Sequence, residues 1–195
     1  MFSNSIFKFF LISLLIHLNY SFKSGRFIKQ KCQVLRSTKV DDKIEVKEYF
    51  DNEGFSRWNK IYSDSDDVNS VQRNIREGHQ QTIDKVLNWV SGESNSGKTL
   101  CDAGCGTGSL AIPMASKFKK VFASDISKSM TEEAAARAKQ INIKNIEFKV
   151  SDMEEIKGKY DTVTCIDVFI HYPTDKVKPF LQLYLFTYCN FFQTN

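Results

Sequence analysis

The segment Thr-Leu-Cys-Asp-Ala-Gly-Cys-Gly-Thr-Gly, residues 99–108, has the pattern of a short buried strand that runs into a glycine-rich turn. Gly104, Gly106 and Gly108 stand at alternate positions, where they let the backbone turn sharply and approach a ligand closely. Asp102 is expected at the carboxyl end of the strand, which is where ligands bind in open α/β sheets. The segment therefore predicts a ligand site at the edge of a parallel sheet.

A second apolar strand with a terminal acid follows at residues 121–125. Asp125 lies about 20 residues beyond the glycines, the separation expected for a carboxylate that binds ribose hydroxyls. The glycine spacing, however, differs from the G-x-G-x-x-G form of dinucleotide-binding folds. It resembles instead the first motif of the class I S-adenosylmethionine-dependent methyltransferases. That resemblance implies an α/β Rossmann-like open sheet with helices on both faces and S-adenosylmethionine as methyl donor.

A competing motif lies directly upstream, because residues 92–99 fit the phosphate-loop pattern G-x-x-x-x-G-K-[ST]. A phosphate loop needs a strand before it and a helix after it. Here the order is reversed: apolar residues recur at helical spacing between Val71 and Val90, and a strand follows Lys98. We interpret residues 91–98 as a polar linker, and a nucleoside triphosphatase is the least favoured alternative.

Two further strands are expected at residues 146–150 and 160–168, with an alanine-rich helix over 131–140 before them. The second of these strands is apolar enough to lie centrally in the sheet. Asp152 and Met153 follow the first at its carboxyl end, where they are predicted to contact the adenine of the ligand. The alternative for Asp152 is that it caps a following helical turn.

An aromatic segment precedes the sheet, with five aromatic residues between positions 49 and 62, ahead of a helix that carries Arg73, Arg76 and His79. Aromatic faces stack on flat ligands and arginines pair with carboxylates, so Trp58, Arg73 and Arg76 are candidate substrate-binding residues. The alternative is that these aromatic side chains form the apolar face of a helix docked on the sheet.

Residues 1–40 read as a targeting leader. Residues 1–21 hold one early lysine and a short apolar run, as in a signal peptide, and residues 22–40 are basic, hydroxyl-rich and free of acids, as in a transit peptide. Such a bipartite leader resembles those of algae with complex plastids, and a secretory signal with a basic linker is the alternative. The remaining chain is expected to comprise a helical arm and first helix over residues 41–90 and a ligand-binding domain over 91–195.

Charge and cysteine content exclude some classes of function. Removing residues 1–40 deletes seven basic residues and no acidic ones, which changes the formal charge from +4 to −3. The domain therefore offers no electrostatic case for nucleic-acid binding. The five cysteines are odd in number and lack paired C-x-x-C spacing, so we expect packing residues rather than disulfides or a metal site.

An ordered set of short segments is distinctive along residues 43–178. They are Tyr49-Phe50, Gly54-Phe55, Arg57-Trp58, Ile61-Tyr62, Val71-Gln72, Ile75-Arg76, Gly78 to Thr82, Cys101 to Leu110, Ser124 to Ser127, Gly158 to Thr162, Asp167-Val168 and Ile170 to Pro173. With this set the chain closely resembles the magnesium-protoporphyrin IX O-methyltransferases of chlorophyll synthesis.

This resemblance implies methyl transfer to a propionate carboxylate of magnesium-protoporphyrin IX in a plastid, with magnesium chelatase and a plastid membrane surface as possible partners. Tyr62 and His171 would line the acceptor site as catalytic residues. The residues expected to bind the methyl donor are Asp102, Gly104, Gly106, Gly108, Asp125, Ile126, Asp152, Met153 and Asp167.

The chain departs from that family after Pro179, where the helix pattern is lost and the last three strands of a seven-stranded sheet are missing. We therefore expect a chain truncated at its C-terminus. The alternatives to the porphyrin enzyme are another small-molecule methyltransferase and a non-catalytic remnant that binds S-adenosylmethionine or porphyrin.

Overall fold

The computed structural model describes residues 42–63, 65–91 and 94–172. The expected signal and transit segments, and the residues after Pro179 on which the expected truncation rests, lie outside this part. The helices and strands occur in the order α2 (Asp42–Asp51), α3 (Glu53–Ile61), α4 (Ser70–Ser91), β1 (Thr99–Ala103), α5 (Ala111–Met114), β2 (Lys120–Asp125), α6 (Lys128–Gln140), β3 (Ile146–Val150), the 3-10 turn η1 (Met153–Glu155), β4 (Thr162–Thr164) and the 3-10 turn η2 (Phe169–His171).

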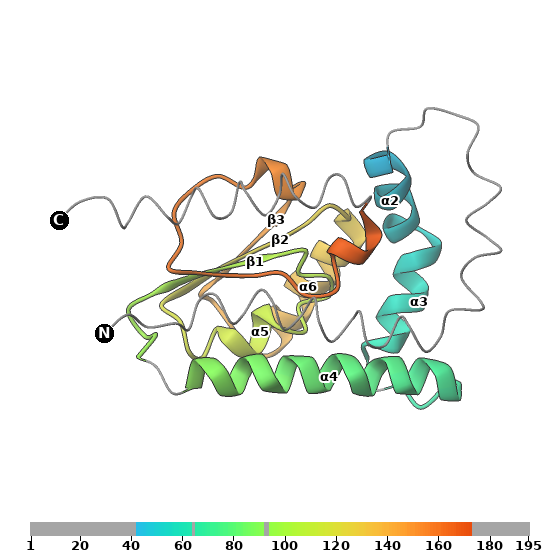
Figure 1. The fold of residues 1–195 in the computed structure, drawn as a ribbon, viewed down its shortest axis with the longest axis horizontal. Helices are drawn as coiled ribbons and strands as arrows, with labels where there is room; N and C mark the ends of the chain where they lie inside the picture. Colours follow the sequence, from blue (N-terminus) through green and yellow to red (C-terminus); the bar gives the residue numbers. More distant parts are fainter. Residues whose placement is uncertain (1–41, 64, 92–93, 173–195) are drawn as a thin grey trace. The chain divides into compact units, whose positions relative to one another are not determined.

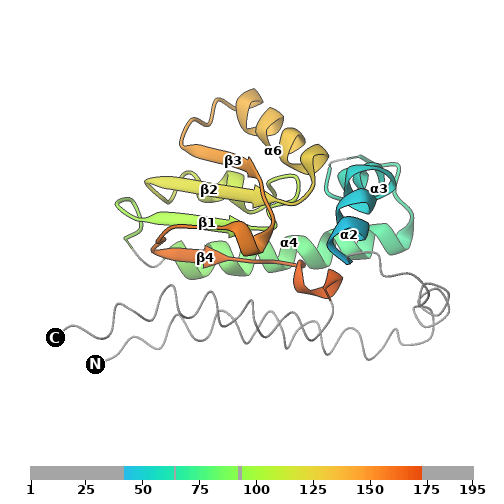
Figure 2. The same ribbon diagram turned by 90° about the horizontal axis from the view of Figure 1, so that it is seen from above.

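The strands form one parallel sheet in the order β3-β2-β1-β4. Figure 2 shows this order and places α2 and α3 beyond the carboxyl ends of the strands. The chain runs outward from β1 to β3 and then crosses back to β4 on the other side of β1. Because the strand order reverses at β1, the crevice beside its carboxyl end is the expected ligand position of such a sheet.

Helices α4, α5 and α6 lie on one face of the sheet in Figure 1, and over the other face the described residues supply only η1. Strand β1 is the centre of the core, since Leu100, Cys101, Asp102 and Ala103 are all buried. Both faces of β1 are therefore covered, as in the central strands of parallel sheets.

Local sequence accounts for α6. Its N-cap Ser127 accepts a hydrogen bond from the Met130 backbone N–H, which satisfies one of the open donors of the first turn. Ala134 and Ala138 are small enough to pack closely, and both are buried. The helix begins at Lys128, three residues earlier than the sequence pattern predicts, because Ser127 is the capping residue.

The fourth strand differs most from expectation. Residues 160–168 were predicted as a central strand, but only Thr162–Thr164 are strand, and in the described part they form an edge of the sheet. The ladder to β1 ends at the pair Asp102 and Thr164. Asp167 then adopts a left-handed φ of 59°, which turns the chain out of the strand direction. The predicted length of this strand is therefore wrong, while its central position stays a prediction.

Among the described helices, none combines the length and apolar character that crossing a bilayer requires.

Candidate functional site

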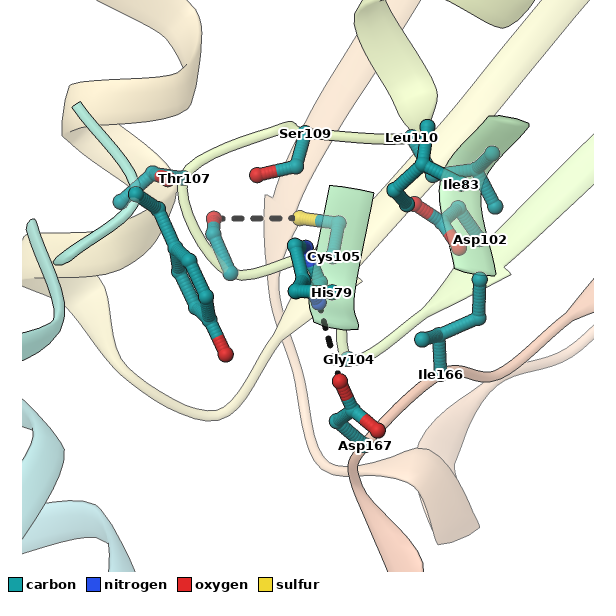
Figure 3. A pocket seen from close by; sticks show the side chains of 12 residues that line it. His79, Ile83, Asp102, Gly104, Cys105, Thr107, Ser109, Leu110, Ile166 and Asp167 are labelled. Atoms are coloured by element: carbon teal, nitrogen blue, oxygen red, sulfur yellow. Dashed lines mark hydrogen bonds and ion pairs between the residues drawn. The ribbon is translucent and has the colours of Figure 1, made fainter. Parts of the chain in front are cut away.

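A pocket opens at the carboxyl edge of the sheet, beside the turn that follows β1 (Figure 3). It brings together residues of the arm, of α4, of the glycine turn and of the segment after β4. They are Tyr62, His79, Ile83, Asp102, Gly104, Cys105, Gly106, Thr107, Ser109, Leu110, Ile166 and Asp167.

The glycine turn forms one wall of this pocket. Gly104, Gly106 and Gly108 all have positive φ, at 76°, 52° and 86°. A Cβ atom on Gly104 would lie 2.2 Å from Val168 Cγ2, whereas a Cβ on Gly106 would meet no atom within 4 Å. Gly104 is therefore required by packing, and Gly106 leaves open a space that a ligand can approach.

Asp125 holds the turn in this shape. Its Oδ2 accepts a hydrogen bond from the Gly106 backbone N–H and its Oδ1 accepts one from the Ser127 N–H, each at 2.9 Å. Burial raises the pKa of Asp125, while these two hydrogen bonds oppose that rise. Ile126, between Asp125 and Ser127 in the chain, is half-buried. The acid predicted to bind ribose thus stands at the turn.

Asp102 is 3% exposed and accepts a hydrogen bond from the Thr164 hydroxyl at 2.7 Å. Burial raises the pKa of Asp102 to about 6, and nearby Asp125 adds to the rise, while the Thr164 bond and His79 oppose it. Keeping this buried carboxylate ionised costs free energy. A cationic group of a ligand beside it would offset that cost.

At the end of β3, the capping alternative for Asp152 is present, since Asp152 Oδ1 accepts a hydrogen bond from the Glu154 N–H at 3.0 Å. The other carboxylate oxygen forms an ion pair with Lys43 of α2 at 2.8 Å. Met153 is 3% exposed and packs in a cluster with Ala103. The predicted roles of both residues toward adenine stay predictions.

Tyr62 lies on the arm side of the pocket. Its ring stacks on His79, with centroids 4.2 Å apart, and lies 5.4 Å from the Trp58 ring. Burial and the nearby Asp167 carboxylate raise the pKa of Tyr62 well above its usual range. The phenol therefore stays protonated near neutral pH and can donate a hydrogen bond.

His79 was given no role by the sequence analysis. Its Nδ1 lies 2.9 Å from Asp167 Oδ2, a pair separated by 88 positions in the chain (Figure 3). No local pattern around His79 distinguishes it from a surface residue of α4. Only the placement of α4 beside the segment after β4 identifies it as a site residue.

His171 lies in η2 and does not line the pocket of Figure 3. Its ring contacts Phe50 of α2 edge to face, with centroids 4.9 Å apart. The arm and the segment after β4 thus meet at these two rings. Tyr62, at the end of α3, and His171, in η2, both lie where the arm meets the sheet.

The two arginines proposed for substrate binding are not brought to the pocket. The Arg76 guanidinium donates to the backbone carbonyls of Ile61, Lys60 and Ser65, at 2.6, 3.0 and 2.9 Å, so it closes the connection after α3. Arg73 is exposed on the first turns of α4. Trp58 packs on Tyr62, and its buried Nε1 has no hydrogen-bond partner among the residues that the structure describes.

The phosphate-loop motif lies at the opposite end of β1 from the glycine turn. Helix α4 ends at Ser91 before it, and β1 begins at Thr99 after it. The Thr99 backbone N–H and hydroxyl both donate to Asp161, at 2.7 and 2.9 Å. No helix N-terminus follows Lys98, so the elements that bind phosphates in such loops are not arranged here.

Within the described ranges, no group of three or more His, Cys, Asp or Glu residues could hold a metal ion. Burial raises the pKa of the thiols of Cys101, Cys105 and Cys165, which keeps them protonated.

Comparisons with known proteins agree with this geometry. Residues 94–187 match the family model of a methyltransferase domain. The chain is 50% identical over 138 residues to the chloroplastic magnesium protoporphyrin IX methyltransferase of Arabidopsis thaliana, covering 69% of this chain and 44% of the relative. It is 45% identical over 146 residues to the magnesium-protoporphyrin O-methyltransferase of Synechocystis, covering 73% and 63%. The chain thus spans about half the length of the curated relatives it matches.

A solved structure is similar as well. The crystal structure of magnesium protoporphyrin IX methyltransferase from Synechocystis PCC 6803 with bound S-adenosylmethionine superposes with a TM-score of 0.69 at 45% identity, over 73% of this chain and 69% of the other. The fold is that of the class I S-adenosylmethionine-dependent methyltransferases, as the glycine turn predicted. The chain belongs to the magnesium protoporphyrin IX methyltransferase family.

Proposed function

We propose that the protein transfers the methyl group of S-adenosylmethionine to a propionate carboxylate of magnesium-protoporphyrin IX, giving the monomethyl ester. The observation that carries this proposal is the row of carboxylates at the ends of adjacent parallel strands. Asp102 is the last residue but one of β1, Asp125 ends β2 and Asp152 follows β3, in a chain 45% identical to a relative solved with this methyl donor.

The proposed path of the donor runs along this edge of the sheet. The open space at Gly106 and the pocket beside Asp102 take the methionine part, Asp125 binds the ribose hydroxyls, and Asp152 with Met153 faces the adenine. Carboxylates suit this ligand, because ribose hydroxyls and the adenine amino group both donate hydrogen bonds.

The bound sulfonium supplies an electrophilic methyl group. A propionate resembles a glutamate side chain, whose pKa near 4.3 leaves it ionised at neutral pH, so the protein has no proton to remove. Catalysis then rests on holding the carboxylate oxygen about 3 Å from the methyl carbon, in line with the bond that breaks. Tyr62, kept protonated by burial, can donate a hydrogen bond to that carboxylate. His171, which contacts Phe50 of the arm, is the second residue proposed to orient it.

The test is an assay of the full chain with methyl-labelled S-adenosylmethionine and magnesium-protoporphyrin IX. Label in the porphyrin ester is the expected result. Binding of S-adenosylhomocysteine without any labelled ester would favour the non-catalytic remnant instead. Label in a different acceptor, such as a quinol, with none in the porphyrin would favour another small-molecule methyltransferase.

The phosphate-loop alternative is tested by Lys98→Ala. Because Lys98 directly precedes β1, at the end of the strand opposite the glycine turn, we expect the variant to bind S-adenosylhomocysteine as the wild type does. Loss of ATP binding on this substitution would instead identify a nucleotide site.

We also propose that the protein acts in a plastid, reached through the bipartite leader of residues 1–40, with magnesium chelatase as the source of its porphyrin at a membrane surface. The chloroplastic relative from Arabidopsis supports the location. Expression of the full chain with a C-terminal fluorescent tag should label plastids, and deletion of residues 1–21 should leave the label outside them. Co-purification with magnesium chelatase subunits tests the partner.

A further inference from the structure

Asp51, the last residue of α2, is hydrogen-bonded to the start of α6 although 76 positions separate it from Ser127. Its Oδ1 accepts from the Ser127 hydroxyl at 2.7 Å and from the Ser129 backbone N–H at 3.2 Å. Its backbone carbonyl accepts a third hydrogen bond, from the Ser129 hydroxyl at 3.0 Å. The arm therefore supplies the acceptor for an open N–H group in the first turn of α6, beside the acceptor that the N-cap Ser127 supplies.

Ser127 connects this contact to the proposed donor site. It is fully buried, and its backbone N–H donates to Asp125 Oδ1 at 2.9 Å. The other oxygen of Asp125 accepts from the Gly106 N–H. A carboxylate offers about four acceptor positions, so Asp125 can still accept from a ribose hydroxyl, in a direction that the place of Ser127 helps to fix.

The charge of Asp51 acts differently from its geometry. Burial acts to raise the pKa of Asp51, but the Lys47 ion pair at 2.7 Å and the hydrogen bonds from Ser127 and Ser129 lower it below its ordinary value. Asp51 is therefore a carboxylate in this contact. For Asp125 that charge is unfavourable: burial raises the pKa of Asp125, and the neighbouring Asp51 carboxylate adds to the rise. Any benefit to Asp125 comes from the hydrogen bonds, which an uncharged acceptor at position 51 can also make.

We propose that Asp51 is a positioning residue for the methyl donor: by fixing Ser127, it holds Asp125 in the orientation that binds the ribose hydroxyls of S-adenosylmethionine. This inference rests on the proposed function, in which Asp125 binds the ribose. It adds a residue of the arm that touches no ligand and still determines the affinity for one.

The test is calorimetry on the full chain with S-adenosylhomocysteine and with its 2′,3′-dideoxy analogue, which lacks both ribose hydroxyls and keeps every other group. The wild type should bind the analogue about ten- to a hundredfold more weakly, as expected for lost hydrogen bonds to a carboxylate. Asp51→Ala should bind S-adenosylhomocysteine about tenfold more weakly, and the ratio of the two affinities should fall below about threefold. A variant that only loosens the fold weakens both ligands alike and leaves this ratio unchanged.

Three further variants complete the comparison. Asp51→Asn keeps an oxygen acceptor for Ser127 and removes the charge, so it should retain the wild-type ratio. Ser129→Ala removes only the hydrogen bond to the Asp51 carbonyl, so it should lower the ratio in part. Glu48→Ala, at an exposed position of the same helix as Asp51, is the matched control and should bind both ligands as the wild type does.

The outcomes separate this inference from the proposed function. A wild-type ratio in both Asp51→Ala and Ser129→Ala would overturn the role of Asp51 alone, and if Asp51→Ala does not fold, Ser129→Ala decides by itself. Loss of the ratio in Asp51→Asn would also overturn it, because the charge and not the geometry would then act on Asp125. Equal binding of the two ligands by the wild type would overturn the assignment of Asp125 to the ribose, and binding of neither would overturn the proposed donor site.

Discussion

Arg137 of α6 donates hydrogen bonds from one Nη1 atom to two partners, the Tyr62 carbonyl oxygen and the Thr107 hydroxyl, each at 3.3 Å. Its other nitrogens bond to Asn59 of the arm and, at 2.8 Å, to Glu133. One side chain therefore joins the arm, where the acceptor is expected, to the glycine turn, where the methyl donor is expected. This guanidinium therefore holds the expected acceptor site and the expected donor site in fixed positions relative to each other.

Replacing Arg137 with methionine should remove the hydrogen bonds that join the arm to the glycine turn. The side chain is partly buried, and hydrogen bonds to charged groups contribute about 1.5–3 kcal/mol each when shielded, so we expect kcat/KM for the porphyrin to fall at least tenfold. Lys139→Met, on the exposed side of the same helix, is the matched control and should keep full activity. Equal activity of the two variants would show that the link is structural only.

The glycines of the turn should respond differently to alanine. Both Gly104→Ala and Gly106→Ala incur the cost of a left-handed backbone, about 1–2 kcal/mol. Gly104→Ala adds a Cβ 2.2 Å from Val168, so its unfolding temperature should fall much further. Gly106→Ala adds a methyl group to open space, so it should fold and yet bind S-adenosylhomocysteine poorly. Thermal melts with and without that ligand check both outcomes, and a Gly106→Ala protein with normal affinity would contradict the assigned ligand path.

Asp102 should make stability depend on pH. Its pKa is raised to about 6 in the fold from 3.8, so between these values the folded state binds a proton that the unfolded state does not. The free energy of unfolding contributed by this group is then highest below about pH 4, and falls as pH rises to about 6, by about 2 to 3 kcal/mol in total. Asp102→Asn removes the titration, so the stability difference between variant and wild type should change over this window and stay constant above it. Urea unfolding from pH 4 to 8 measures it, and parallel curves for the two proteins would contradict the raised pKa.

His171 should act by position rather than by proton transfer. His171→Asn keeps a hydrogen-bonding group and should retain appreciable methyl transfer, whereas His171→Ala should lose most of it. Ile170→Ala, an exposed neighbour in η2, serves as the control for damage to this turn. Unfolding temperatures are needed beside the rates, because the alanine variant also loses the contact with Phe50. Near-equal loss in the asparagine and alanine variants would contradict a positioning role.

The local sequence pattern was sufficient to predict those elements whose structure depends on neighbouring residues in the chain. The strand and turn of residues 99–108 could be predicted because a strand buried on both faces is rich in apolar residues and the turn demands positive φ at its glycines. Asp125 was placed correctly at the end of β2 because the apolar run that directly precedes it identifies that strand. The length of β4 could not be predicted, since a strand extends only as far as its partner and its backbone angles allow.

The remaining site residues depend on contacts between distant segments. The sequence suggests that Arg76 binds a ligand, whereas in the fold its guanidinium donates to three backbone carbonyls. His79 is identified as a site residue only by its contact with Asp167. Arg137 is identified only by its hydrogen bonds to Tyr62 and Thr107. A hydrogen bond requires two groups within about 3 Å, and the amino-acid order does not state which side chains separated by tens of residues will meet. The sequence alone specified the glycine turn and its acids, whereas the packing of the arm and α4 against the sheet decided which of the other polar residues line the pocket.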